Sequence, residues 1–376
     1  MKYFLTPNAV LKHLEKPYLY NIKNDELYEL NKTSFQFLID CSTKNGGYSN
    51  DNKFIEYCIK EGILNKKYTA VKRPIIKKSP IPSLRYLELQ ITNRCNLRCR
   101  HCFINHQNDE LGLEQIKKVL TEFEKMQGLR VMITGGEPLM HSKFKEINEM
   151  LADFSFRRVL FTNGLLINKK LLNKLNIHEI QISIDGLEKA HDSIRGRGTF
   201  KKAIRSLKQA IDSGIDISVA TMIHRKNLND FDKMQKLFTR MGIKEWTVDI
   251  PCITGRLKEN PDFQITPVEG SKFLSYGYSG GIHSSSKGYA CGLHLMAVNA
   301  NGYASKCSFY SDSPVGHINE GLQACWSRIK PIKLSTLKCD CDFIEICRGG
   351  CRFRAELSGE KSGKDPYKCA YFKKSI

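Results

Sequence analysis

The sequence predicts an α/β protein whose central part is built on a parallel sheet, open or closed. Between about residues 85 and 250, apolar segments of strand length alternate with amphipathic stretches of helix length. Such alternation is typical of repeated βα units, which pair their strands in parallel. A small unit with its own strand and helix signals precedes this part, and a cysteine-rich, loop-rich region follows it after about residue 285.

The strands of the central part are apolar runs bounded by polar or glycine-containing turns. We expect them at Tyr86–Thr92, Leu129–Thr134, Arg158–Thr162, Glu179–Ile184, Asp216–Met222 and Glu245–Ile250. Helices lie between them, for example at Leu113–Met126 and Phe200–Ser213. In the cysteine-rich region we expect a core built around metal rather than around aliphatic packing.

Residues 1–63 predict a small separate domain. Two strands, Tyr18–Ile22 and Leu27–Leu30, are joined by a polar turn, and two helices follow. Asn31 or Thr33 is suited to cap the first helix and Asp51 the second. Residues 64–84 are rich in lysine and proline and lack acidic side chains, which predicts a semi-extended basic linker.

Composition narrows the classes of protein that remain. No stretch approaches the ~20 apolar residues that span a bilayer, and the N-terminus lacks an apolar signal-peptide core, so we expect a cytoplasmic protein without membrane contact. The net charge of +20 attracts polyanions. We interpret it as a solvated lysine-rich surface, because no RNA-binding signature accompanies it, and we expect no nucleic-acid partner. In the cytoplasm, we expect the 14 cysteines to serve as metal ligands more than as disulfides.

The most specific motif is a CxxxCxxC sequence directly after the first predicted strand. It places Cys95, Cys99 and Cys102 on one loop. Three thiolates on one loop suit an iron–sulfur cube whose fourth iron is left open, whereas a structural zinc site normally takes four ligands. We therefore predict a [4Fe–4S] cluster at this loop.

Together with Gly135-Gly136-Glu137-Pro138 after the second strand, this motif resembles the radical S-adenosylmethionine (SAM) superfamily. The resemblance implies a partial (β/α)6 TIM barrel as the radical SAM core, over residues 85–284. It also implies that the open iron chelates the amino and carboxylate groups of SAM. One electron from the reduced cluster then yields methionine and a 5′-deoxyadenosyl radical, which abstracts a substrate hydrogen atom.

Further matches to the superfamily follow in chain order and carry its cofactor-binding roles. The Gly-Gly-Glu-Pro segment corresponds to the part that holds the SAM amino group. Ser183 and Asp185 resemble ribose-contacting positions, and Arg195 resembles an arginine that contacts the SAM carboxylate. The expected cofactor-binding residues are Gly135, Gly136, Glu137, Pro138, Thr162, Asn163, Ser183, Asp185 and Arg195. His101 departs from the aromatic or apolar residue that many members carry there. No catalytic side chain is predicted.

The C-terminal cysteines, in residues 285–376, closely resemble a SPASM domain, which implies two auxiliary iron–sulfur clusters. The expected ligands of auxiliary cluster I are Cys291, Cys307 and Cys351; those of cluster II are Cys339, Cys341, Cys347 and Cys369. Cluster I then has an open iron, or Cys325 fills it. The short spacing Cys339-Asp340-Cys341 leaves the nuclearity of cluster II open, and a double zinc site is the rival interpretation. Cys41 and Cys58 fall on apolar helix faces and are expected in the core.

Residues 1–63 resemble the winged-helix-like recognition element of enzymes that modify ribosomally made peptides, a domain related to the pyrroloquinoline quinone chaperone. The segment Leu30–Ser34, the apolar helix after it and Glu61-Gly62-Ile63-Leu64 carry the resemblance. It implies that a leader peptide adds as an extra strand to the edge of the domain's sheet. An accessory fold that only packs on the barrel is the alternative.

These resemblances together imply a radical SAM peptide maturase. A precursor peptide would dock on the N-terminal domain and be crosslinked, converted to a thioether or otherwise modified, with an electron donor such as flavodoxin or ferredoxin. Ser308 stands where similar sulfatase maturases carry an aspartate base, which argues against formylglycine formation; an open iron on cluster I favours thioether chemistry. The alternatives are an enzyme acting on a tetrapyrrole or other small molecule, a peptide carrier without turnover, and an RNA modifier.

Overall fold

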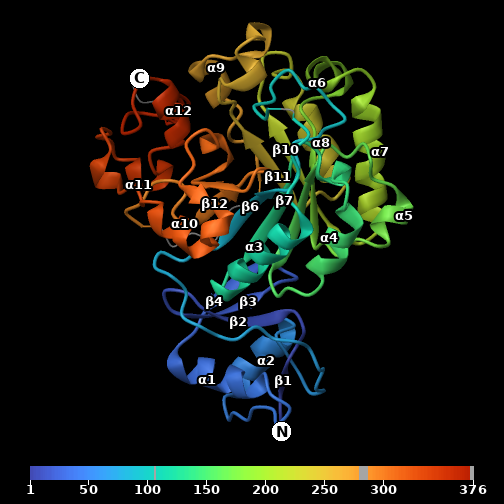
Figure 1. Ribbon diagram of the computed structural model, residues 1–376, viewed down its shortest axis with the longest axis vertical. Coiled ribbons are helices and arrows are strands. Elements are labelled where there is room, and N and C mark those ends of the chain that lie inside the picture. The colour runs from blue at the N-terminus through green and yellow to red at the C-terminus, as the bar shows by residue number, and fades with distance from the viewer. Residues whose placement is uncertain (106, 279–286, 373–376) are drawn as a thin grey trace.

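The computed structural model describes residues 1–105, 107–278 and 287–372. Its centre is a nine-stranded sheet, and an N-terminal unit with a three-stranded and a two-stranded sheet lies below it (Figure 1). The C-terminal region packs to one side of the central sheet, toward the upper left of the view (Figure 1). Within the described residues, no helix is both long and apolar enough to cross a membrane.

The N-terminal unit consists of short antiparallel strands and two capped helices. Its elements are β1 (Phe4–Leu5), β2 (Ala9–His13), β3 (Pro17–Asn21), β4 (Glu26–Glu29), α1 (Lys32–Cys41), α2 (Asn52–Lys60) and β5 (Leu64–Asn65). The Asn31 side chain accepts a hydrogen bond from the Ser34 amide, and Asp51 accepts one from Phe54. Both expected strands, both helices and the buried positions of Cys41 and Cys58 are confirmed. Strands β1, β2 and β5 had not been predicted.

The central sheet begins with six parallel strands in chain order. They are β6 (Tyr86–Gln90), β7 (Arg130–Thr134), β8 (Arg157–Thr162), β9 (Glu179–Ser183), β10 (Asp216–Met222) and β11 (Glu245–Asp249). Each predicted strand is confirmed to within two residues at either end. The helices around them are α3 (Leu113–Lys125), α4 (Phe144–Leu151), α5 (Lys169–Leu172), α6 (Glu188–Arg195), α7 (Thr199–Asp212), α8 (Phe231–Arg240) and α9 (Pro267–Ser271).

Alternation along the strands separates the two faces of this sheet. Leu87 and Leu89 of β6 join the large core cluster beneath the helices, whereas Tyr86 belongs to a smaller cluster with Met132 and Val159. Because successive side chains of a strand point to opposite faces, Glu88 shares the face of Tyr86. The helix-covered face is therefore apolar, and the other face carries polar groups in addition to apolar ones.

The C-terminal region continues the same sheet. Strand β12 (Leu295–Val298) pairs in parallel with β6, and β13 (Tyr303–Ser305) and β14 (Gly316–His317) follow antiparallel. The main core cluster includes Met296, Val298 and Trp326 of this region. The sequence had suggested a core built around metal rather than around apolar packing, and that expectation is corrected here. Its helices are α10 (Leu322–Arg328), α11 (Ile344–Cys347), α12 (Arg352–Leu357) and α13 (Pro366–Tyr371). The expected boundary at 284/285 touches residues outside the described part.

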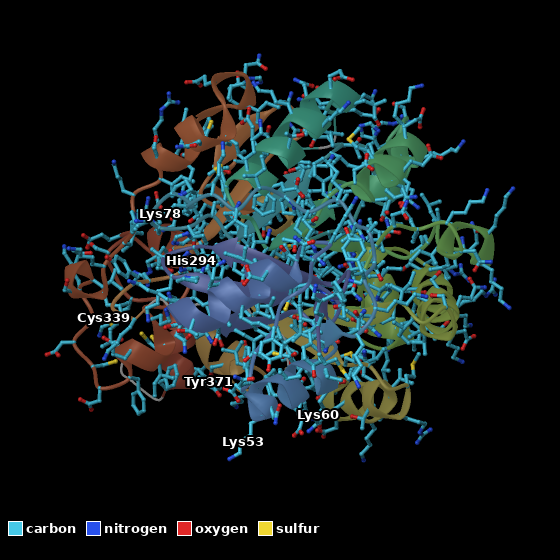
Figure 2. All side chains as sticks on the ribbon, turned by 90° about the horizontal axis from the view of Figure 1, so that it is seen from below. Lys53, Lys60, Lys78, His294, Cys339 and Tyr371 are labelled. Atoms are coloured by element: carbon cyan, nitrogen blue, oxygen red, sulfur yellow. The ribbon has the colours of Figure 1, made fainter. Side chains whose placement is uncertain are left out.

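Cys339 lies at the periphery of the C-terminal region. In the view from below it is well separated from Lys53 and Lys60, which project outward from α2 of the N-terminal unit (Figure 2). The thiol-rich region and the N-terminal unit therefore occupy different parts of the molecular surface.

The basic linker is bound to the N-terminal unit. Lys78 forms a parallel bridge with His13, and the Ser79 amide donates to the His13 carbonyl, so the linker lies along the outer edge of β2. The Arg73 guanidinium donates to the carbonyls of Ala9 and Leu5. The opposite edge of this sheet, at β4, pairs with no other strand in the described part of the chain.

Buried polar contacts join the N-terminal unit to the lower end of the central sheet. The Arg157 guanidinium donates to the Ile22 carbonyl at 2.9 Å and also pairs with Glu179 at 3.0 Å and Asp216 at 2.9 Å. The buried Lys12 ammonium donates to the Gly128 carbonyl. Burial lowers the pKa of Lys12 to about 8, and the negative charge of Glu124 opposes this decrease. Glu124 therefore favours the protonated ammonium that donates to Gly128.

We expect Arg157→Ala to lower the free energy of unfolding by roughly 3–5 kcal/mol, because it leaves the buried Glu179 carboxylate without its cation. The measurement is a urea titration followed by circular dichroism. Lys244→Ala is the matched control: Lys244 pairs with the same Asp216 at 2.5 Å, but its side chain is 74% exposed. It should cost less than about 1 kcal/mol. Equal losses in the two variants would contradict the buried network.

Candidate active site

Three cysteine thiols line one cavity at the C-terminal ends of the parallel strands. The cavity has a volume of about 190 Å³. Nine of the sequence-predicted residues line it: Cys95, Cys99, Cys102, Gly135, Gly136, Thr162, Asn163, Ser183 and Arg195. Ligands of α/β sheets bind at this end of the strands, where the loops converge. Residues from the cysteine loop, from three strand ends and from the end of α6 (Glu188–Arg195) therefore meet at the position where a cofactor would bind.

The two glycines of the Gly-Gly-Glu-Pro segment allow it to pack on the backbone of the cysteine loop. A Cβ atom at Gly136 would lie 2.5 Å from the Arg94 carbonyl oxygen, and one at Gly135 would lie 2.7 Å from that of Thr92. This contact lets the Gly136 amide donate to the Thr92 carbonyl at 2.8 Å. Glycine is therefore required at both positions because the backbone of residues 92–94 leaves no room for a Cβ atom, whether or not a ligand is bound.

Glu137 is fully buried and joins the loops from behind the cavity wall. Its Oε1 accepts from the Thr162 hydroxyl at 2.8 Å and its Oε2 accepts from the Asn163 amide at 2.8 Å. The Asn163 side chain in turn donates to Asn96 on the cysteine loop at 2.7 Å. Burial raises the pKa of Glu137 to about 7, although these hydrogen bonds oppose the rise. Glu137 and Pro138 are not among the residues that line the cavity.

Asp185 is buried and orients Arg195. Its Oδ2 accepts from the Arg195 Nε at 2.6 Å, and its Oδ1 accepts from the Met222 amide at 2.7 Å. Burial alone would raise the pKa of Asp185, but the guanidinium holds it well below its usual range. Asp185 therefore lies behind the cavity wall, whereas Arg195 reaches the cavity and carries a positive charge toward Cys99.

His101, the departure from the family pattern, faces the same buried cluster. Its Nε2 lies 3.8 Å from Asp185, and desolvation lowers its pKa to about 3, so the ring is neutral at physiological pH. The sequence did not indicate this interaction with Asp185.

The chemistry of the three thiols fits an iron–sulfur cluster. Burial raises the pKa of Cys95 to about 12, so the thiolate requires a bound cation to form at neutral pH. Within the described residues, no three His, Cys, Asp or Glu side chains converge as ligands of a single metal ion. The thiolates of a cube each bind a different iron, so they do not need to converge on one point. Arg195 adds a positive charge beside the thiols.

The C-terminal thiols fall into two groups. Burial raises the pKa of Cys307 to about 12, and Cys291 and Cys351 are among the neighbours that raise it further. Burial likewise raises the pKa of Cys369 to about 11, with Cys339 and Cys347 beside it. Cys341 and Cys347 also act on the pKa of Cys339, which burial raises. Cys325 donates to the His317 carbonyl at 3.5 Å, and its charged neighbours are Glu320, Arg328 and Glu122.

Several residues around the site were not predicted from the sequence. Phe161, Gln181 and Arg256 also line the cavity. Gln181 precedes Ser183 by two positions on β9, so strand alternation would have indicated it. Glu88 of β6 accepts from the Ser308 amide at 3.0 Å, which places a carboxylate beside Cys307. Burial raises the pKa of Glu88. No local pattern indicated Arg256 or the Glu88 contact, because both depend on segments distant in the sequence.

Comparison with known proteins identifies the central part of the chain. Residues 89–238 match the radical SAM superfamily, so this part of the chain is a radical SAM domain. Enzymes of this superfamily use SAM and a [4Fe–4S] cluster. The cysteine loop and the strand ends that line the cavity lie within or at the margin of this domain.

Individual relatives belong to two functional classes. The AdoMet-dependent heme synthase of Nitratidesulfovibrio vulgaris is 24% identical over 77% of this chain and 93% of its own length. The mycofactocin maturase MftC of Mycolicibacterium smegmatis is 32% identical over 42% of both chains. The crystal structure of Streptococcus suis SuiB bound to its precursor peptide SuiA superimposes with a TM-score of 0.71 at 15% identity, covering 98% of this chain and 99% of SuiB.

We expect Glu137→Gln to weaken the pH dependence of stability. The folded protein holds the Glu137 proton up to about pH 7, whereas the unfolded chain releases it near pH 4.5. The protonated carboxyl therefore stabilises the fold below pH 4.5, and this contribution is lost as the pH rises through 7. Between pH 5 and 8 the free energy of unfolding of the parent should fall by roughly 2–3 kcal/mol more than that of the variant. Urea titrations at several pH values measure the difference.

Glu114→Gln, which changes an exposed carboxylate on α3, is the control and should leave the pH profile of the parent unchanged. A parallel pH profile for Glu137→Gln and the parent would show that Glu137 does not titrate in this range.

Proposed function

We propose that this radical SAM enzyme is a maturase that modifies a ribosomally made precursor peptide. The observation that carries the proposal is the open β4 edge of the N-terminal unit, which offers a peptide a strand to pair with. SuiB, whose fold matches this chain over nearly its whole length, has been crystallised with a precursor peptide, and MftC is a maturase. These likenesses support a peptide substrate.

The register of the N-terminal sheet identifies the backbone groups that face the open edge. Leu19 pairs with Tyr28, and the Leu30 amide donates to the Pro17 carbonyl. Since hydrogen-bonded and non-hydrogen-bonded pairs alternate in an antiparallel ladder, the N–H and C=O groups of Leu27 and Glu29 point away from β3. An extended leader peptide would satisfy these groups, and neighbouring side chains such as Tyr28 and Tyr57 would select its sequence.

The site residues have distinct tasks in this proposal. Cys95, Cys99 and Cys102 would hold the [4Fe–4S] cluster, and Arg195, oriented by Asp185, would bind the carboxylate of SAM. When bound, the reduced cluster and SAM supply a carbon radical that abstracts a hydrogen atom from the substrate. The seven C-terminal cysteines would hold two auxiliary clusters beside the polar face of the sheet, where the peptide core would enter.

A tetrapyrrole substrate is the second candidate. The similarity to the heme synthase favours this substrate class, because that alignment covers 77% of this chain and the MftC alignment covers 42%. The heme synthase alignment nevertheless leaves about a quarter of this chain unmatched, whereas the SuiB fold accounts for the N-terminal unit as well. Mass analysis of the two substrate classes after incubation with the enzyme, SAM and a reductant separates the candidates.

Replacing Cys95, Cys99 and Cys102 together by alanine should abolish reductive SAM cleavage, because the cluster that delivers the electron would lose all its protein ligands. Deoxyadenosine release under anaerobic, reducing conditions is the measurement. The same triple variant should still contain iron and sulfide, held by the C-terminal cysteines. Cleavage at the parent rate would refute the site, and stoichiometric zinc in place of iron would refute the auxiliary clusters.

Glu29→Pro should weaken leader binding at least about tenfold, because it removes an amide that faces the open edge without touching the β3–β4 ladder. Glu29→Ala is the matched control, since it removes the same exposed side chain but keeps the amide. Fluorescence anisotropy with short peptides encoded beside this gene measures the affinity. Deoxyadenosine release without peptide should be equal in both variants.

Equal peptide affinity of Glu29→Pro and Glu29→Ala would exclude leader binding at the β4 edge. These point variants are preferable to deletion of residues 1–63. The deletion would expose Leu129, which packs in one cluster with side chains of the N-terminal sheet, and would remove the Ile22 carbonyl that Arg157 binds.

A further inference from the structure

Cys252 lies on a loop that joins the two thiol-bearing parts of the molecule. It follows β11, the last strand of the parallel run, and its side chain is only 5% exposed. On one side of it, the Arg256 amide donates to the Cys102 carbonyl at 3.0 Å. On the other side, Arg354 of α12 donates to the Ile250 carbonyl at 3.0 Å. The loop is therefore fixed between the radical SAM site and the C-terminal region.

The thiols of Cys252 and Cys351 are close neighbours: their interaction raises the pKa of Cys252 and lowers that of Cys351. Cys351 is one of the three thiols predicted for auxiliary cluster I, and it interacts electrostatically with Cys307, which also neighbours Cys291. Cys252 thus joins this group as a fourth thiol. Cys325, the other residue considered for that position, instead contacts the His317 carbonyl and has Glu320 and Arg328 as its charged neighbours.

Two cationic side chains that follow or precede these cysteines in the chain, Arg352 after Cys351 and Lys306 before Cys307, lack part of their hydrogen-bonding partners. Arg352 is 0% exposed, yet its Nε and Nη2 atoms have no hydrogen-bond partner. The Lys306 ammonium is also buried without a partner, and Cys291 and Cys307 are among the groups that act on its charge. Unpaired buried cations are costly, so this location favours an anion. Four thiolates around a doubly positive iron–sulfur core leave a net charge of about −2, which both cations would neutralise.

We infer that Cys252 is the fourth ligand of auxiliary cluster I, together with Cys291, Cys307 and Cys351. The inference rests on the auxiliary clusters of the proposed function. A cluster with four protein thiolates has no free iron position for a substrate thiol. Its remaining role is to carry single electrons, and the two adjacent cations would make its reduction easier. A thioether formed by this enzyme would then not require the substrate cysteine to bind the cluster.

The test detects an open iron on the auxiliary clusters. The variant Cys95→Ala/Cys99→Ala/Cys102→Ala serves as background. It removes the cluster that has only three protein ligands and therefore one iron free to bind cyanide. Cys252→Ala and Cys325→Ala are each added to it, and the reconstituted, reduced proteins are treated with ¹³C-labelled cyanide. Iron and sulfide are quantified, and electron–nuclear double resonance measures ¹³C coupling to a cluster.

We expect no ¹³C coupling in the background protein or with Cys325→Ala, and clear coupling with Cys252→Ala. Coupling in the background protein, or coupling that appears with Cys325→Ala and not with Cys252→Ala, would overturn the inference. A background protein without any iron–sulfur cluster would refute the proposed auxiliary clusters themselves, and the inference with them. The iron content therefore distinguishes the two failures.

Cys252→Ser covers the case in which Cys252→Ala does not fold or loses the cluster. A serine oxygen is a ligand of similar size but harder than sulfur, so both auxiliary clusters should be retained. The electron paramagnetic resonance spectrum of one of them should shift relative to the background protein, and a superimposable spectrum would overturn the inference.

Discussion

The active site depends on one buried carboxylate that fixes the distance between loops. The proposed cluster and SAM can share the cavity only if the cysteine loop keeps its position relative to the strand ends. Glu137 provides this restraint: it bonds to Thr162 and Asn163, and Asn163 bonds to Asn96 on the cysteine loop. Because the carboxylate is buried, each of its hydrogen bonds is costly to leave unmade. The glutamate of the Gly-Gly-Glu-Pro segment thus supports the cavity from behind.

The same sheet brings the other parts of the molecule to this site. At its lower end, the Arg157 contacts hold the N-terminal unit against the strands, far from the cavity. At its edge, β12 pairs with β6, the strand that leads into the cysteine loop. The loop after β11, at the other end of the parallel run, reaches α12 through Arg354. The C-terminal region therefore contacts both edges of the parallel part of the sheet.

Much of the fold could be predicted because local sequence patterns specified it. Alternation and helical periodicity located all six strands of the parallel run and both N-terminal helices, down to the caps at Asn31 and Asp51. Most of the strands that escaped prediction, β1, β5 and β12 to β14, are only two to four residues long, whereas the missed strand β2 has five residues. The shortest of these strands carry almost no period-2 signal, and their pairing is decided by a partner elsewhere in the chain.

The sequence by itself determined the chemistry that depends on short spacings: three thiols on one loop, the glycines after the second strand, and the polar side chains at strand ends. Within a few residues, chain geometry limits where side chains lie, so such motifs can be interpreted before the fold is known. Only the tertiary structure decided that Asp185 supports Arg195 from behind the cavity wall, and that Cys252 meets Cys351. Asp185 and Arg195 lie on different elements, and Cys252 and Cys351 lie far apart in the sequence. Their contacts therefore depend on how the elements pack, and no local pattern records them.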